Sequence, residues 1–65
     1  MENRLKILRN NRGWTQEELS EKIGVSRQTV ISLENGRYSP SLSLAFKIAR
    51  TFECAIEEIF IDGNE

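Results

Sequence analysis

Residues 15–35 of this 65-residue chain read TQEELSEKIGVSRQTVISLEN, and this stretch decides the fold. Thr15 stands where a helix N-cap is expected, and Glu18 follows at the spacing of a capping box. Gly24 can end that helix in the left-handed conformation, and Ser26 is the N-cap of a second helix. The stretch therefore predicts two short helices joined by a tight turn.

Apolar residues support both helix starts. Trp14 before the first cap and Leu19 at the fourth helical position can close a hydrophobic staple. Val25 and Val30 repeat this spacing around the second cap. Two capped helices in this arrangement form a helix-turn-helix at about residues 15–35.

The flanking sequence predicts three further helices. The first extends from about Asn3 to Arg12, and the last covers Ile56 to about Phe60. Between them a helix begins after the N-cap Ser41. Its expected inward face comprises Leu42, Ala45, Ile48, Ala49 and Phe52. Five short helices with tight connections indicate an all-α fold, a five-helix orthogonal bundle that forms a single domain over residues 1–65.

Composition excludes several classes of function. Cys54 is the only cysteine and histidine is absent, so we expect no internal disulfide, no metal site and no cofactor. An enzyme is not expected, because the chain has no Gly-rich phosphate loop and no paired carboxylates in a plausible cleft. A charged start without a long apolar run indicates neither a signal peptide nor a membrane span. We therefore expect a cytoplasmic chain with no membrane partner.

The distribution of charge matters more than its sum. A net charge of −1 and a pI near 5.4 argue mildly against nucleic-acid binding. However, residues 1–12 and 26–50 each carry four basic residues against one acidic residue, whereas residues 51–65 carry five acidic residues and no basic one. If the acidic segment lies opposite the basic ones, one face can attract phosphate.

The helix expected from Arg27 to about Asn35 carries the candidate binding residues. At 100° per residue, Val30 and Leu33 point to one side of it. The other side and its edges comprise Arg27, Gln28, Ile31, Ser32 and Asn35. Arginine can bond guanine O6 and N7, and glutamine can bond adenine N6 and N7, so this side suits the major groove of DNA. Taken alone, the same residues are also compatible with an ordinary solvated helix surface.

Six short motifs extend over nearly the whole chain: WTQEEL at 14–19, IGVSRQTV at 23–30, LENGRY at 33–38, PSL at 40–42, LAFKIA at 44–49 and IEEIF at 56–60. In order and spacing they resemble the Cro/repressor-type (XRE-type) helix-turn-helix family of bacterial and phage regulators. The resemblance implies a lambda-repressor-like DNA-binding domain that regulates transcription, most often as a repressor. It also implies two partners, double-stranded DNA and a second copy of the chain on a palindromic operator.

The resemblance implies roles for individual residues. The base-reading positions are Arg27, Gln28, Thr29 and Ser32. The positions that contact and position the DNA backbone are Gln16, Ser26, Asn35, Arg37 and Tyr38. Arg9 and Glu34 match a structural ion pair between the first helix and the end of the third. For Gln16 the alternative is an ordinary exposed glutamine.

Three positions depart from the family pattern. Ile31 replaces a polar residue, and it could contact a thymine methyl or pack against the protein. Ala55 replaces the usual cap of the last helix, and Glu53 stands where glycine or asparagine often ends the fourth. Cys54 between them is expected to be a small buried hydrophobe rather than a redox sensor.

The apolar run of Ile56, Ile59, Phe60 and Ile61 exceeds what a last short helix needs to cover a small core. We predict that part of it forms the interface of a homodimer. The alternative is that all four residues complete the core of one copy. A second class of function is an antitoxin or another protein-interaction module with the same fold, which the low pI leaves open.

Overall fold

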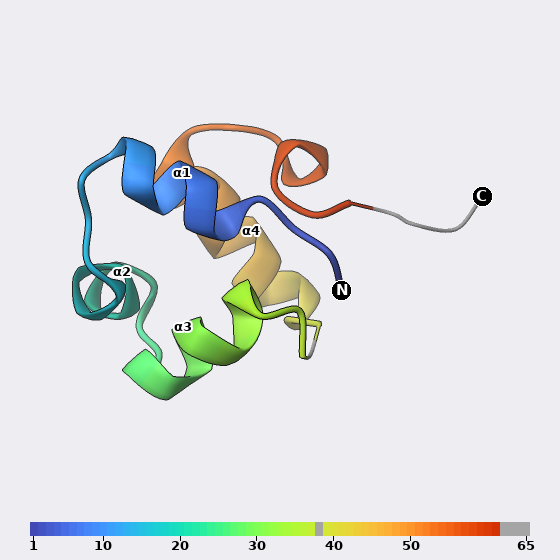
Figure 1. The fold of residues 1–65 in the computed structure, drawn as a ribbon. Helices are drawn as coiled ribbons and strands as arrows, with labels where there is room; N and C mark the ends of the chain where they lie inside the picture. Colours follow the sequence, from blue (N-terminus) through green and yellow to red (C-terminus); the bar gives the residue numbers. More distant parts are fainter. Residues whose placement is uncertain (38, 62–65) are drawn as a thin grey trace.

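A computed structural model describes residues 1–37 and 39–61. Four α-helices follow in order: α1 (Leu5–Asn11), α2 (Gln16–Ile23), α3 (Arg27–Glu34) and α4 (Leu42–Phe52). A short 3₁₀ helix, η1 (Ile56–Glu58), comes after them (Figure 1). The all-helical fold is therefore confirmed for the described part of the chain, which also contains no helix long and apolar enough to cross a membrane.

The prediction of a fifth α-helix over residues 56–60 is wrong. The structure has only the three residues of η1 at this place. Ala55 precedes it in an extended conformation and provides no side-chain hydrogen bond to the first turn. Without a cap, the free backbone N–H groups at a helix start lack partners, and an α-helix this short has little else to stabilise it.

The three predicted N-caps are confirmed. Thr15 forms a complete capping box, in which the Glu18 N–H donates to Thr15 Oγ1 at 3.0 Å and the Thr15 N–H donates to Glu18 Oε1 at 2.7 Å. Ser26 and Ser41 each accept a backbone hydrogen bond three residues later. Gly24 ends α2 with φ of 72°, in the left-handed region. The turn between α2 and α3 is thus fixed by local chemistry at both ends.

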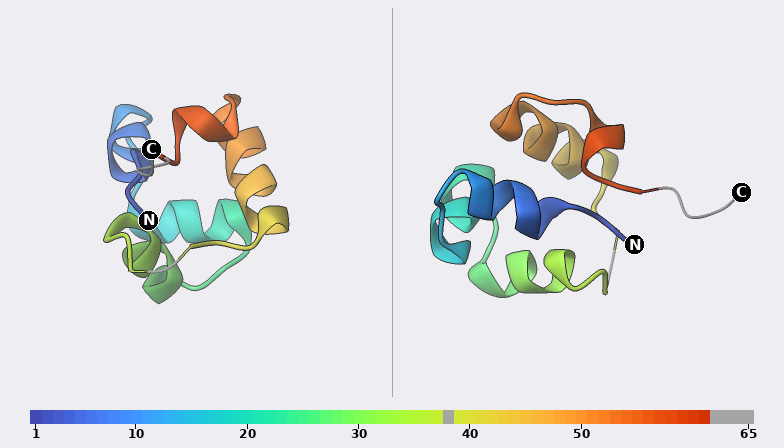
Figure 2. Two further views of the ribbon diagram at one scale, coloured as in Figure 1. Left: turned by 90° about the vertical axis from the view of Figure 1, so that its right-hand side faces the viewer. Right: turned by 45° about the horizontal axis from the view of Figure 1, so that its top comes forward.

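The helices lie at steep angles around one centre (Figure 2). The fully buried side chains come from all four α-helices and the residue after η1: Leu5, Leu19, Ile23, Val30, Leu33, Ile48 and Ile59. Most of the inward face expected for α4 is buried, but Leu42 is 67 % exposed, so its place in that face was wrong. Leu42 is the first residue of α4, and Phe46 one turn later on the same side of the helix is also 47 % exposed.

The end of α4 holds the two unusual residues of this fold. Glu53 closes the helix with φ of 57°, the conformation for which glycine or asparagine was expected. Cys54 follows it, half-buried against the core cluster. Burial raises the pKa of the Cys54 thiol, the nearby Glu58 carboxylate raises it further, and Arg12 opposes the shift. This thiol therefore keeps its proton more firmly than a free cysteine does.

Residues 2–4 join two distant parts of the fold. The Arg4 N–H donates to the Ile59 carbonyl at 2.7 Å, and the Ile61 N–H donates to the Glu2 carbonyl at 2.9 Å. These bonds flank an antiparallel bridge between Asn3 and Phe60. The Asn3 side chain also donates to the Leu33 carbonyl at 2.8 Å. Through Asn3, the end of α3 is tied to the segment that follows η1.

Candidate nucleic-acid interface

The first turn of α3 presents the polar side chains that the sequence singled out. Val30 and Leu33 are fully buried, so α3 has one orientation relative to the core. With those two residues inward, Arg27 and Gln28 are exposed, and Ser32 is half-buried. The structure therefore places three of the predicted base-reading residues on the surface of one short helix.

The fourth predicted base-reading residue, Thr29, already forms hydrogen bonds within the protein. The Thr29 N–H donates to Ser26 Oγ at 3.1 Å, and the two hydroxyl groups form a hydrogen bond of 2.9 Å. Ser26 and Thr29 thus form the N-terminal cap of α3 and lie directly beside Arg27 and Gln28. A phosphate or base at this end would meet both hydroxyls together with the positive end of the helix dipole.

A buried ion pair holds the opposite end of α3. Arg9 Nε donates to Glu34 Oε2 at 2.6 Å, and Arg9 Nη2 donates to Glu34 Oε1 at 3.2 Å. The two side chains are only 9 % and 3 % exposed. Arg9 Nη1 also donates to the Trp14 carbonyl at 2.8 Å. The ion pair that the resemblance implied is therefore present, and it connects α1 and the start of α2 to the end of α3.

Gln16 belongs to the same network. Its amide Nε2 donates to Glu34 Oε1 at 3.1 Å, and its side chain is part of the first turn of α2. This contact supports the role of Gln16 as a buttress of α3 and disagrees with the alternative of an ordinary exposed glutamine. Its contact with a DNA phosphate stays a prediction.

The chain leaves α3 through a Schellman motif. The Arg37 N–H donates to the Ser32 carbonyl at 3.0 Å, and the Gly36 N–H donates to the Leu33 carbonyl at 3.0 Å. Gly36 has φ of 72°, which this motif requires. As a result, the backbone of Asn35 and Arg37 is fixed while both residues remain exposed. Tyr38, the last of the predicted backbone contacts, lies outside the described residues.

Ile31 is half-buried on the flank of α3. Its position leaves both interpretations of this residue open, contact with a thymine methyl and packing against the protein. The structure buries two of the four residues predicted for the dimer interface: Ile59 is fully buried and Phe60 is 8 % exposed within one copy. These two residues are therefore part of the core of one copy, whereas Ile56 and Ile61 are half-buried.

Sequence reasoning missed the position of Lys47. This residue of α4 extends its ammonium group to the turn between α2 and α3, where Nζ lies 3.0 Å from the position that a Cβ at Gly24 would take. The only signal in the sequence was a basic residue on the outer side of α4. The structure thus places the positive charge of Lys47, a residue of α4, near the N-terminal cap of α3.

Comparison with known proteins gives three findings that agree with this geometry. A family described as helix-turn-helix matches residues 5–59. An uncharacterized HTH-type transcriptional regulator from Methanocaldococcus jannaschii is 57 % identical over 61 residues, which are 94 % of this chain and 92 % of the relative. The crystal structure of a hypothetical transcription factor from Neisseria has a TM-score of 0.76 at 33 % identity, over 83 % of this chain and 61 % of that one.

A more distant relative is named as an antitoxin. The antitoxin HipB of Escherichia coli strain CFT073 is 39 % identical over 54 residues. The match covers 83 % of this chain but only 57 % of HipB. Similarity to HipB is therefore limited to little more than half of that protein.

Proposed function

Because this chain belongs to the XRE-type helix-turn-helix family of transcriptional regulators, we propose that it binds double-stranded DNA with sequence specificity and represses transcription as a homodimer on a palindromic operator. The observation that carries the proposal is the first turn of α3, where Arg27 and Gln28 are exposed on a helix that cannot rotate. The buried side chains of Val30 and Leu33 fix that helix on the core. The hydrogen bonds of Glu34 with Arg9 and Gln16 fix its C-terminal end.

In the proposed complex, the N-terminal part of α3 enters the major groove. Arg27 bonds a guanine through O6 and N7, and Gln28 bonds an adenine through N6 and N7. Ser32 and Thr29 lie on the same helix and read neighbouring positions. A rigid helix suits this task, because side chains that are already placed lose less entropy on binding.

The remaining predicted contacts flank this helix and position it. Gln16 and Ser26 begin α2 and α3, so their side chains and the adjacent backbone N–H groups suit phosphate oxygens. Asn35 and Arg37 contact the backbone of the DNA at the other end of α3. Tyr38 stays part of this proposed set on the basis of the sequence alone.

One copy offers few base contacts, and two copies related by a two-fold axis double them. Their recognition helices would then lie about 34 Å apart, which is one turn of DNA. A dimer seated on a promoter excludes polymerase by its bulk. In this form the chain needs no cofactor for repression.

The proposal is tested by selecting duplex DNA from a random pool at near-physiological salt. We expect a palindrome whose half-sites are about one helical turn apart. The matched control is the double variant Arg27→Ala/Gln28→Ala, which keeps the buried face of α3 and should select no motif. If the wild-type protein also selects no motif and releases DNA at modest salt, the proposal fails.

The similarity to HipB favours a second candidate function, a module that binds a protein partner. In an antitoxin of this kind, DNA reading and partner binding would both reside in one chain. The selection experiment identifies a module that binds only protein, because such a module yields no DNA motif. An antitoxin of this kind would still select a motif, and binding of a protein partner by the Arg27→Ala/Gln28→Ala variant would then distinguish it.

A further inference from the structure

Residues 1–3, which we call the N-terminal arm, lie along the end of α3 (Figure 1). The Met1 nitrogen donates to the Gly36 carbonyl at 2.8 Å. A Cβ at Gly36 would lie only 3.1 Å from the Met1 carbonyl oxygen, so the arm comes this close because Gly36 has no side chain. The N-terminal arm therefore packs directly against the turn that leads from α3 to Arg37.

Asn3 uses its whole side-chain amide in this arrangement. Its Nδ2 donates to the Leu33 carbonyl at 2.8 Å and to the Met1 carbonyl at 3.0 Å, and its Oδ1 accepts from the Leu5 N–H at 3.0 Å. The Leu33 carbonyl also accepts from the Gly36 N–H at 3.0 Å, which is a hydrogen bond of the Schellman motif. Asn3 thus binds the same carbonyl that closes the turn after α3.

The start of α1 does not account for the amide of Asn3. An aspartate at position 3 could also accept from the Leu5 N–H, but an ionised carboxylate has no hydrogen to donate. The two donated hydrogen bonds go to the N-terminal arm and to the end of α3. The donor half of this side chain therefore serves α3.

The N-terminal arm is itself anchored in the core. Asn3 forms the antiparallel bridge with Phe60, and the Arg4 N–H donates to the Ile59 carbonyl at 2.7 Å. Ile59 is fully buried and Phe60 is 8 % exposed. The amide of Asn3 therefore reaches α3 from a fixed position.

We propose that Asn3 is a positioning residue for the DNA backbone contacts of Asn35 and Arg37. Both of these residues are exposed, and they lie directly before and after Gly36. The direction of their side chains therefore depends on the turn that Asn3 holds through the Leu33 carbonyl. The inference rests on the proposed function, because only the proposed complex gives Asn35 and Arg37 a phosphate to contact.

Amide hydrogen exchange tests whether Asn3 holds the turn. The N–H groups of Gly36 and Arg37 both donate within the Schellman motif, so their exchange reports its opening. Asn3→Ala should speed their exchange by about fivefold, the factor that one typical hydrogen bond contributes. Asn3→Asp should speed it equally, because the carboxylate cannot donate but still accepts from the Leu5 N–H.

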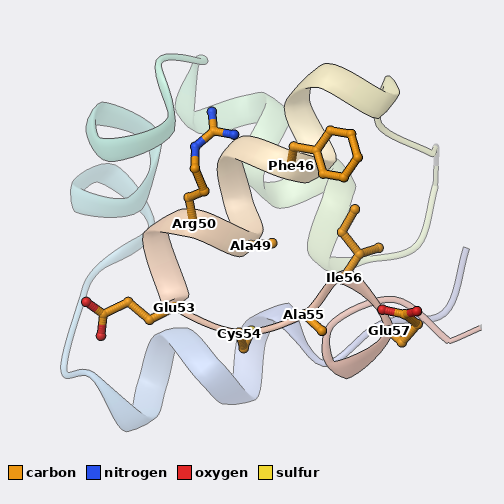
Figure 3. Close-up of a pocket in the computed structure, with 8 residues that line it drawn as sticks. All are labelled: Phe46, Ala49, Arg50, Glu53, Cys54, Ala55, Ile56 and Glu57. Carbon is orange, nitrogen blue, oxygen red and sulfur yellow. The ribbon is translucent and has the colours of Figure 1, made fainter.

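Ala49→Gly is the control for a general loss of stability, because glycine is unfavourable inside a helix. Ala49 lines a groove of about 780 Å³ between α4 and η1, and no residue that lines this groove belongs to the N-terminal arm or to residues 33–37 (Figure 3). This variant should speed exchange of the slowest core amides and leave the N–H groups of Gly36 and Arg37 unchanged. If Asn3→Ala gives the same pattern as Ala49→Gly, Asn3 contributes only stability and the proposal fails.

Binding to the selected operator gives a second readout. Asn3→Ala should weaken binding by about fivefold. It should leave base preference unchanged, because contacts with the DNA backbone carry no base information. In an Arg37→Ala background the same substitution should cost about twofold or less, since the side chain that it positions is gone, whereas in an Arg27→Ala background it should still cost about fivefold. Equal costs in the two backgrounds overturn the proposal.

Asn11→Ala is the matched asparagine control, because Asn11 is exposed at the end of α1. It should leave operator binding and the exchange of both N–H groups within about twofold of the wild type. The two proposals also fail differently. If the wild-type protein selects no DNA motif, both fail. If it selects a motif but Asn3→Ala binds the operator like Asn11→Ala, the role of Asn3 fails alone.

Discussion

At the scale of single residues, Glu53 has both an unfavourable backbone conformation and a contact with Arg12. It ends α4 in the left-handed conformation with φ of 57°, where most side chains clash with their own backbone. Its carboxylate also lies 4.0 Å from the Arg12 guanidinium, although 83 % of the Glu53 side chain is exposed. Contacts this exposed contribute little to stability, so the backbone conformation dominates.

Glu53→Gly should raise the free energy of unfolding by about 1 kcal/mol, because glycine adopts the left-handed conformation without strain. Urea unfolding measures the change. Glu53→Ala is the control, since alanine removes the carboxylate but keeps the strain, and it should give no such gain. An equal gain for both variants would assign the effect to the lost negative charge.

Arg27 and Arg37 should respond differently to truncation. Arg27→Ala should weaken binding to the selected operator by about 1–3 kcal/mol and relax base preference at one position of each half-site. Arg37→Ala should weaken binding to all sequences alike, because contacts with the backbone carry no base information. Binding titrations with operator variants distinguish the two, and uniform losses for both would contradict the division into reading and positioning residues.

At the scale of the helices, Glu34 connects three of them. Its carboxylate accepts from Arg9 of α1 and from Gln16 of α2, while its own backbone ends α3. Removing one partner of a buried pair leaves the other charge buried without compensation. The orientation of α3 therefore depends on a carboxylate that need not touch DNA.

Glu34→Ala should lower the free energy of unfolding by about 3–5 kcal/mol, which is most of the stability of a domain this size. Glu21→Ala is the matched control, because Glu21 is an exposed glutamate in the middle of α2, and it should change stability by less than about 0.5 kcal/mol. Thermal and urea unfolding measure both. Similar small changes in the two variants would mean that the Arg9–Glu34 pair adds nothing.

The helices also show which features the sequence could predict. Thr15, Ser26 and Ser41 act within one turn of their own position, so their caps followed from local sequence. The hydrogen bond from Gln16 to Glu34 depends on how α2 packs on α3, and no local pattern specifies its geometry. Leu42 was misplaced for a similar reason, since helical periodicity does not show how much of an apolar face the neighbouring elements cover.

At the scale of the whole molecule, binding to DNA must overcome a net charge of −1. Acidic residues of the described segment 51–61 lie at the end of α4 and in η1, whereas Arg27 and Arg37 lie on and after α3. The sequence could predict this division in outline. It could not predict the burial of Ile59 and Phe60, because whether these residues are free or buried depends on how they meet the other helices.

DNA affinity should fall steeply with salt despite the low pI. The slope of log affinity against log salt concentration should be about −0.9 per contacted phosphate, and Arg37→Ala should make it shallower by about 1. The control is Lys22→Ala, because the Lys22 ammonium lies over the Trp14 ring, 4.5 Å from its centre. Binding titrations over a salt series measure the slopes, and an unchanged slope for Arg37→Ala would remove Arg37 from the phosphate contacts.

The pairing of residues 2–4 with residues 59–61 can form only late in the synthesis of this chain. A growing chain that already contains Arg27 and Gln28 still lacks Ile59, a fully buried member of the core, and the backbone partner of Arg4. Such a fragment lacks the hydrogen bonds that hold residues 2–4 against residues 59–61, although Asn3 can already reach the Leu33 carbonyl. The first turn of α3 is thus made early on the ribosome, but the core beneath it is complete only after Ile59 has emerged.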